Sequence, residues 1–173
     1  KRITFFSDSV IISFKENESD QFFNIICDLQ ILLINLAIRG VFMRGAITYG
    51  KLHHDNKYIF GPAFIEAYDK ETKQAIYPRI ICSKEMLLLN HGPKSLHEFK
   101  QDLPHFFEIF NVDEDGLLYV DYFEKAINQL DDLKETLNYF AKLKKIIENN
   151  LDVYRKSHNR KVLTKYIWLK NMY

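Results

Sequence analysis

One stretch of the sequence, residues 22 to 36, constrains the fold more than any other. Its apolar residues recur at spacings of three and four, the period of an α-helix; they are Phe22, Ile25, Ile26, Leu29, Leu32, Leu33 and Leu36. Since they occupy nearly the whole circumference, we expect this helix to be well buried. Gly40 follows it, and glycine commonly ends helices because it adopts left-handed backbone easily. A chain of 173 residues is long enough to bury such a helix in one domain core.

Short β-rich runs and helices alternate on both sides of this segment. Before it, residues 2–6 and 10–14 predict a tight hairpin with Asp8 at its tip. After it, Pro62 opens a predicted helix from Gly61 to about Ala75. The remaining predicted elements are strands at 41–52, 58–60 and 79–82, a short helix at 83–90, a second hairpin over 106–112 and 117–122, and helices from Tyr122 to the end.

This order of elements predicts an α+β fold with a ferredoxin-like βαββαβ core. The residues after Lys1 already have the pattern of a core strand, so we expect the first strand of that core to lie upstream of Lys1. We divide the chain into a core at 1–90, a loop with the second hairpin at 91–123 and a helical tail at 124–173. This core accommodates many functions, so the fold alone does not decide the function.

The helical tail has two local signals of its own. An apolar stripe at helical spacing predicts the buried face of a long helix, formed by Leu133, Leu137, Phe140, Leu143 and Ile147. Asp132 and Glu135 have the spacing of a capping box, which predicts the start of that helix. The tail is also rich in lysine and arginine, which is typical of a solvated helix face; a partner helix or a nucleic acid is the less favoured alternative.

Composition excludes some classes of function. With 24 Lys and Arg against 23 Asp and Glu, the formal net charge is +1, which argues against a strongly electrostatic nucleic-acid binder. The most apolar stretch, Leu29 to Ile38, is too short to span a bilayer, so we expect no membrane association. Cys27 and Cys82 lie in apolar runs, which favours reduced core thiols over a disulfide and predicts a cytoplasmic protein.

Several charged residues leave two interpretations open. Arg44 precedes a strand that should be internal, so it either contacts phosphate or pairs with Glu66 or Glu71. Arg79 begins another strand, where a phosphate and a carboxylate are equally good partners. The acidic turn at 113–116 suggests calcium, but it lacks the later ligands of an EF-hand loop, so a hairpin turn is favoured.

Three segments together resemble the catalytic domain of class III nucleotidyl cyclases. The first is FFSDSVIISF at 5–14, in which Asp8 follows a small residue at a hairpin tip, where the family has its second metal-binding Asp. The second is RGAITYG at 44–50, which is similar to the family strand with a basic residue first and a glycine six positions later. The third is FGPAFIEAYDKETKQAIYPRIICS at 60–83, which resembles the family's aromatic-glycine, helix and strand ending in serine.

The resemblance implies a metal-dependent enzyme that converts a nucleoside triphosphate to a cyclic nucleotide in bacterial signalling or anti-phage defence. Asp8 would bind Mg²⁺ or Mn²⁺, although a simple turn former is the other interpretation of this residue. Arg44 would be the catalytic contact to phosphate. Thr4, Tyr58, Gly61 and Glu66 would border the nucleotide, with Thr4 and Tyr58 in place of the usual Lys and Asp that recognise a purine. Because class III sites form between two domains, a homodimer is expected.

The sequence departs from the family where the transition state is stabilised. Ile65 and Asp69 occupy the positions of the family's Asn and Arg, and neither donates the hydrogen bonds that those residues provide. The absence of the Lys and Asp pair that recognises a purine leaves room for a pyrimidine nucleotide as substrate. These departures also leave two alternatives: a catalytically degenerate module of the same fold that binds a nucleotide or a protein partner, and an α+β domain of unrelated function.

Overall fold

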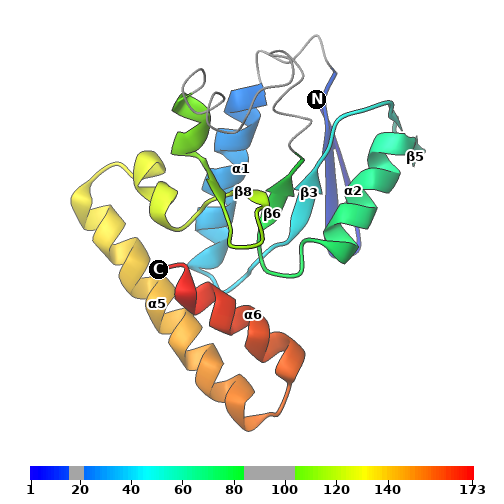
Figure 1. Cartoon of the computed structure of the whole chain (residues 1–173). Helices are drawn as coiled ribbons and strands as arrows, with labels where there is room; N and C mark the ends of the chain where they lie inside the picture. Colours follow the sequence, from blue (N-terminus) through cyan, green and yellow to red (C-terminus); the bar gives the residue numbers. More distant parts are fainter. Residues whose placement is uncertain (16–21, 84–103) are drawn as a thin grey trace.

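The computed structural model describes residues 1–15, 22–83 and 104–173, and it has the expected α+β class (Figure 1). Its central sheet has four strands in the order β3 (Gly45–Ile47), β6 (Ile80–Cys82), β8 (Leu118–Val120) and β7 (Phe110–Val112). β3 and β6 are parallel, whereas β8 is antiparallel to both of its neighbours. β6 and β8 are buried along their whole length, as expected for central strands that are covered on both faces.

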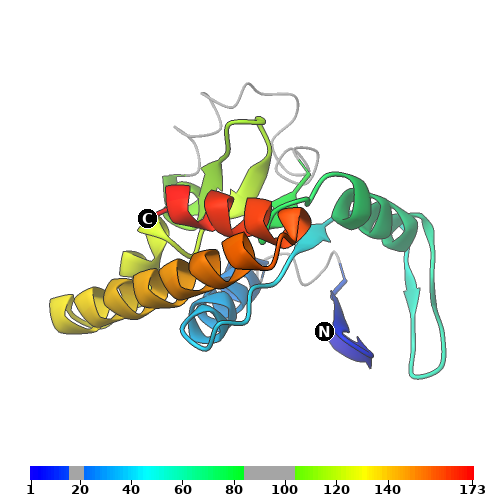
Figure 2. The ribbon, with the colours of Figure 1, turned by 90° about the horizontal axis from the view of Figure 1, so that it is seen from below.

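The predicted first hairpin is confirmed, and it forms a separate two-stranded sheet. β1 (Arg2–Phe6) pairs antiparallel with β2 (Ser9–Ser13), with Phe6 opposite Ser9. Ser7 has a φ of 49°, the left-handed conformation that two-residue hairpin turns need. Figure 2 shows this hairpin apart from the four-stranded sheet.

Helix α1 (Phe22–Ala37) confirms the predicted helix and its end. Its buried residues include Ile26, Leu33 and Ala37, and Gly40 closes the helix with a φ of 76°. We expected this helix to be buried on nearly all sides, and this was wrong for the side that carries Ile31 and Leu32, whose side chains are 41% and 43% exposed. No described element covers that side, which a pattern of apolar residues alone does not show.

A small hairpin and a helix connect β3 to β6. β4 (His53–His54) pairs antiparallel with β5 (Ile59–Phe60), and α2 (Pro62–Lys73) starts at Pro62 as predicted, with Gly61 as its N-cap. The predicted strand at 41–52 is much shorter in the structure. After Ile47 the chain turns onto the start of α2, where the Ala63 amide donates to the Lys51 carbonyl and the Thr48 hydroxyl donates to the Ala63 carbonyl.

Two short 3₁₀ segments, η2 (Pro104–Glu108) and η3 (Glu124–Gln129), lie on either side of the β7–β8 hairpin. The tail begins with η3 and continues with two long helices. α5 (Leu133–Lys156) and α6 (Arg160–Asn171) pack against each other as a helical hairpin (Figure 2). The capping prediction is confirmed: Asp132 accepts a hydrogen bond from the Glu135 amide. The Glu135 carboxylate accepts from the amide of Asp131, one residue earlier than a standard capping box.

The predicted buried face of α5 was partly wrong. Leu133 and Leu137 are 71% and 62% exposed. The buried residues of α5 are also spaced by three and four, but they begin at Thr136 instead of Leu133. They are Thr136, Tyr139, Leu143, Ile147 and Leu151. One apolar core joins residues from α1, β6, β7, β8, α5 and α6, so the tail completes the core of the sheet.

Two further expectations concern the cysteines and the membrane. Cys27 and Cys82 are both free thiols, and Cys82 is buried. Burial raises the pKa of the Cys27 thiol. Within the residues that the structure describes, no helix combines the length and the apolar character needed to cross a bilayer.

Candidate functional site

Asp8 stands at the exposed tip of the β1–β2 hairpin, immediately before β2 begins. Arg44 stands immediately before β3 in the same way. β2 and β3 run in the same direction (Figure 1), so each of these two predicted site residues stands at the start of one of two strands with a common direction. Tyr58 and Gly61 come after β3 in the sequence, Tyr58 between β4 and β5 and Gly61 at the start of α2. No hydrogen bond or ion pair among the described residues joins Asp8 to Arg44, Tyr58 or Glu66.

Thr4 lies on the polar face of the first hairpin and binds a histidine. Its hydroxyl is 2.8 Å from Nε2 of His54, and the hydroxyl of Ser13 is 2.7 Å from Nδ1 of the same ring. Partial desolvation, together with the nearby Arg2, lowers the pKa of His54. The Thr4 hydroxyl, which we expected beside a nucleotide base, therefore joins the β1–β2 hairpin to the β4–β5 hairpin.

Tyr58 belongs to the β4–β5 turn, which Asp55 organises. Both the Lys57 and the Tyr58 amide donate to Oδ1 of Asp55 at 2.7 Å, and Nε2 of His53 lies 2.8 Å from Oδ2. These hydrogen bonds, led by that from Lys57, lower the pKa of Asp55 to about 2. The Tyr58 side chain is 63% exposed, so its ring is open to solvent.

Gly61 is required by its backbone and by its neighbours. It has a φ of 142°, which L side chains rarely adopt, and a Cβ there would lie 2.6 Å from the Lys51 carbonyl oxygen. The glycine that the resemblance places beside the nucleotide thus allows the chain to pass closely before α2 begins. This close passage explains the residue without a ligand.

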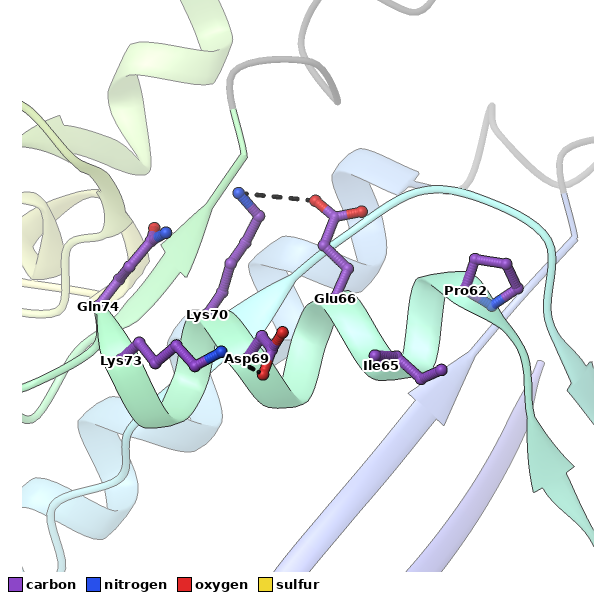
Figure 3. Close-up of a pocket in the computed structure, with 7 residues that line it drawn as sticks. All are labelled: Pro62, Ile65, Glu66, Asp69, Lys70, Lys73 and Gln74. Atoms are coloured by element: carbon purple, nitrogen blue, oxygen red, sulfur yellow. Dashed lines mark ion pairs between the residues drawn. The ribbon is translucent and has the colours of Figure 1, made fainter.

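A groove of about 680 Å³ runs along α2 (Figure 3). Its lining residues are Pro62, Ile65, Glu66, Asp69, Lys70, Lys73 and Gln74. Glu66 pairs with Lys70 at 3.5 Å, and its side chain is 44% exposed. Asp69 pairs with Lys73 at 2.9 Å, and the Ile65 side chain is 62% exposed. Neither side chain donates a hydrogen bond to a phosphate, because an ionised carboxylate only accepts and isoleucine has no polar atom.

Arg44 pairs with Glu71, one of the two carboxylate partners that the sequence left open, and its contact to phosphate stays a prediction. Its Nε lies 2.7 Å from Oε1 of Glu71, and its side chain is 40% exposed. Arg44 also lines a second cavity of about 260 Å³, against helix α6. Sequence reasoning missed this contribution of the tail, because nothing in the local pattern indicates that α6 returns to the start of β3.

Arg79 has carboxylate partners. Its side chain is fully buried, and the guanidinium forms ion pairs with Asp113 and Asp115, while the indole of Trp168 donates to Asp113. Burial raises the pKa of Asp115, but hydrogen bonds from Arg79 and from the Leu117 amide outweigh it, so the pKa stays below its usual range. The acidic turn at 113–116 is thus a hairpin turn that neutralises a buried arginine.

The donor set for a metal is incomplete in the described part of the chain. A hard cation such as Mg²⁺ is usually held by one or two carboxylates plus substrate phosphates. Asp8 offers one carboxylate, and no cluster of three or more His, Cys, Asp or Glu residues suited to a metal occurs among residues 1–15, 22–83 and 104–173. The metal role of Asp8 therefore stays a prediction.

Comparison with known proteins identified no relative: no family model, curated protein or solved structure matches the chain.

Proposed function

We propose that this chain is a nucleotidyl-cyclase-like domain that acts on a nucleoside triphosphate and forms a cyclic nucleotide. The observation that carries the proposal is the position of Asp8 and Arg44, each immediately before one of two strands that run in the same direction. An acidic residue and a basic residue at the starts of two such strands, here in two separate sheets, suit a triphosphate with its accompanying cation if the strands come to lie in one sheet. The proposed setting is bacterial signalling or anti-phage defence in the cytoplasm, with no membrane and no nucleic acid as partner.

The arrangement of strands supports a ferredoxin-like core. β2 and β3 run in the same direction and are connected by α1 (Figure 1). In the described part of the chain, β2 pairs only with β1 and β3 only with β6, so each has one edge without a strand. One antiparallel strand that paired with both edges would join the hairpin and the four-stranded sheet into the proposed βαββαβ order, and unpaired edges favour such pairing.

Residues of this chain would share the work as follows. Asp8 would hold Mg²⁺ or Mn²⁺, whose chemistry in such enzymes is to neutralise the triphosphate. Because the described donors do not complete a metal site, we derive no catalytic step through the ion. Arg44 would contact phosphate, oriented by its ion pair with Glu71. Thr4, Tyr58, Gly61 and Glu66 would border the nucleotide.

The exposed face of the first hairpin supports the proposed homodimer. Four apolar side chains alternate onto one face of this hairpin: Ile3, Phe5, Val10 and Ile12 are 49%, 74%, 40% and 38% exposed. Exposed apolar patches commonly mark protein interfaces. Phe5→Glu should convert a dimer to a monomer in light scattering coupled to gel filtration. Ser9→Glu, on the opposite face of the same hairpin, is the matched control and should leave the mass unchanged.

A second candidate is a non-catalytic binding module of the same fold. Two side chains favour it: Ile65 offers no hydrogen bond, and Asp69 is paired with Lys73 at 2.9 Å. Both occupy positions where the family that the sequence resembles has transition-state donors. A module of this kind would bind a nucleotide without converting it.

One experiment separates the two candidates. The full-length protein is incubated with Mn²⁺ or Mg²⁺ and each of the four ribonucleoside triphosphates, and products are resolved by mass spectrometry. A cyclic mononucleotide that disappears in Asp8→Ala and persists in Asp152→Ala, an exposed acid on α5, supports the enzyme. Saturable binding of a triphosphate without product supports the binding module. If the protein forms no product and binds no triphosphate, both candidates are contradicted.

A further inference from the structure

The second cavity lies where the segment before β3 meets helix α6. One wall is formed by Val162, Lys165, Tyr166 and Leu169, which share one face of α6 because they are spaced by three and four residues. The other wall is formed by alternate residues of the segment that leads into β3, together with Pro78; these are Gly40, Phe42 and Arg44. The cavity thus joins the sheet to the end of the tail, and its volume is about 260 Å³.

The apolar part of this cavity is held in place by aromatic contacts. The rings of Phe42 and Tyr166 meet edge to face with centroids 5.9 Å apart, and Tyr154 stacks on Tyr166 at 5.3 Å. Pro78 and Leu169 are buried behind them. Such walls suit a small flat or branched apolar group. Because pockets for drug-sized ligands run from roughly 300 Å³ upward, the occupant is smaller than those ligands.

The charged part of the cavity is positive. Arg44 and Lys165 are its charged lining residues, and Glu71 balances Arg44 at 2.7 Å. Lys165 is half-buried, and none of the described residues forms an ion pair with it. Helix α6 carries Arg160, Lys161, Lys165 and Lys170 and no acidic residue. The cavity therefore keeps about one uncompensated positive charge beside an apolar wall.

We propose that this cavity binds a small organic anion, in which a carboxylate or a phosphate is attached to one apolar ring. Arg44 and Lys165 bind the anionic group, and Phe42 and Tyr166 contact the ring. The inference goes beyond the proposed function, because it requires neither a metal at Asp8 nor any turnover of a triphosphate. An anion bound there contacts both the segment before β3 and helix α6, so its binding stabilises the packing of α6 against that segment.

The test measures binding to the full chain by isothermal titration calorimetry, in buffer without divalent metal or nucleotide. The probes are phenyl phosphate, benzoate, inorganic phosphate and neutral benzyl alcohol. We expect phenyl phosphate or benzoate to bind at one site. Benzyl alcohol and inorganic phosphate should each bind at least about tenfold more weakly, because the first lacks the anionic group and the second lacks the ring. Comparison of the first two probes shows which anionic group is preferred.

Two variants identify the site. Lys165→Met should weaken the best probe about tenfold, the typical effect of losing one charge-assisted hydrogen bond. Lys161→Met, which removes an equal charge from an exposed position of the same helix, should leave its affinity within about twofold. Val162→Trp fills the cavity without changing the charge and should abolish binding. The proposal is overturned if no probe saturates, if Lys165→Met and Lys161→Met behave alike, or if inorganic phosphate binds as tightly as phenyl phosphate.

Discussion

Arg79 connects segments of the chain that are distant in the sequence. It enters β6 after Pro78, forms ion pairs with Asp113 and Asp115 in the β7–β8 turn, and lies 5.8 Å from the ring centre of Trp168 in α6. Its side chain is fully buried, and its Nε has no hydrogen-bond partner among the described residues. Buried ion pairs contribute little net stability, but removal of one partner is costly because it leaves the other charge unpaired in the interior.

Arg79→Met should therefore lower the free energy of unfolding by about 3–5 kcal/mol, the typical effect of leaving a buried charge unpaired. Chemical denaturation with urea measures the change. The matched control is Arg155→Met, whose arginine pairs with Asp152 at 3.6 Å on the exposed side of α5. That variant should stay within about 0.5 kcal/mol of the wild type. Equal effects of the two substitutions would contradict the role assigned to Arg79.

Asp121 should make stability depend on pH. Burial raises the pKa of this carboxyl above its ordinary value, against hydrogen bonds from the Phe123 amide and the Asn111 side chain. The folded state thus disfavours the ionised form, and the resulting loss of stability grows as pH rises above about 4, the ordinary pKa of Asp. Asp121→Asn cannot ionise, so its stability relative to the wild type should increase from pH 4 upward. Urea denaturation gives the free energy of unfolding of both proteins across that pH range. If the difference between the two free energies did not change with pH, the inference would be wrong.

Single residues show the limit of prediction from sequence. The sequence marked both Arg44 and Arg79 as charges that need partners, because each stands at the start of a predicted strand. In the structure β6 is internal, whereas β3 lies at the edge of the four-stranded sheet. It left phosphate and carboxylate as alternatives, since nothing in a linear pattern shows which distant residue lies opposite. The structure pairs Arg44 with Glu71 on the next helix and Arg79 with a turn far along the chain.

At the scale of elements, His54 couples two hairpins. Its ring bonds to Thr4 and Ser13 on the first hairpin, while its backbone pairs β4 with β5. These two hydrogen bonds link side chains on the polar face of the first hairpin to the second hairpin. The coupling places the β1–β2 hairpin, with Asp8 at its tip, relative to the rest of the domain.

His54→Ala should release the first hairpin without unfolding the core. The loss of two hydrogen bonds at about 1 kcal/mol each should speed amide exchange in residues 1–15 by about tenfold or more, as measured by hydrogen-exchange mass spectrometry. Because the folded pKa of His54 lies below its ordinary value near 6.5, wild-type protection of this hairpin should fall as pH drops below 6.5. His158→Asn, at an exposed histidine between α5 and α6, is the control. Unchanged exchange in His54→Ala would contradict the coupling.

Elements with strong local signals were predictable. The spacing of apolar residues indicated α1, Gly40 indicated its end, and Gly61-Pro62 indicated the start of α2. The errors arose where tertiary contacts decide. β3 is shorter than its predicted run because the chain turns onto α2. α5 buries the face that starts at Thr136 because residues of that face join the shared apolar core.

At the scale of the whole molecule, the helical tail is part of the core. Trp168 stacks on Tyr77 with centroids 5.3 Å apart and contacts Tyr119 and Phe123 edge to face. The candidate site was predictable only residue by residue: Asp8 and Arg44 were identified from local motifs. The anion cavity was not predictable, because its two walls come from segments that are far apart in the sequence and neither wall has a motif.

The packing of Trp168 predicts that the tail and the sheet unfold together. Trp168 is the only tryptophan, so its fluorescence reports on α6, whereas far-UV circular dichroism reports on all helices. We expect the two urea transitions to coincide, as for a cooperative unit. Leu169→Ala removes a side chain that is 1% exposed and should shift both transitions together, by about 2–5 kcal/mol in unfolding free energy. Ile167→Ala, at a side chain that is 45% exposed, should shift them by much less. A fluorescence transition at a lower urea concentration than the circular-dichroism transition would show that α6 detaches before the sheet unfolds. The tail would then unfold independently of the core.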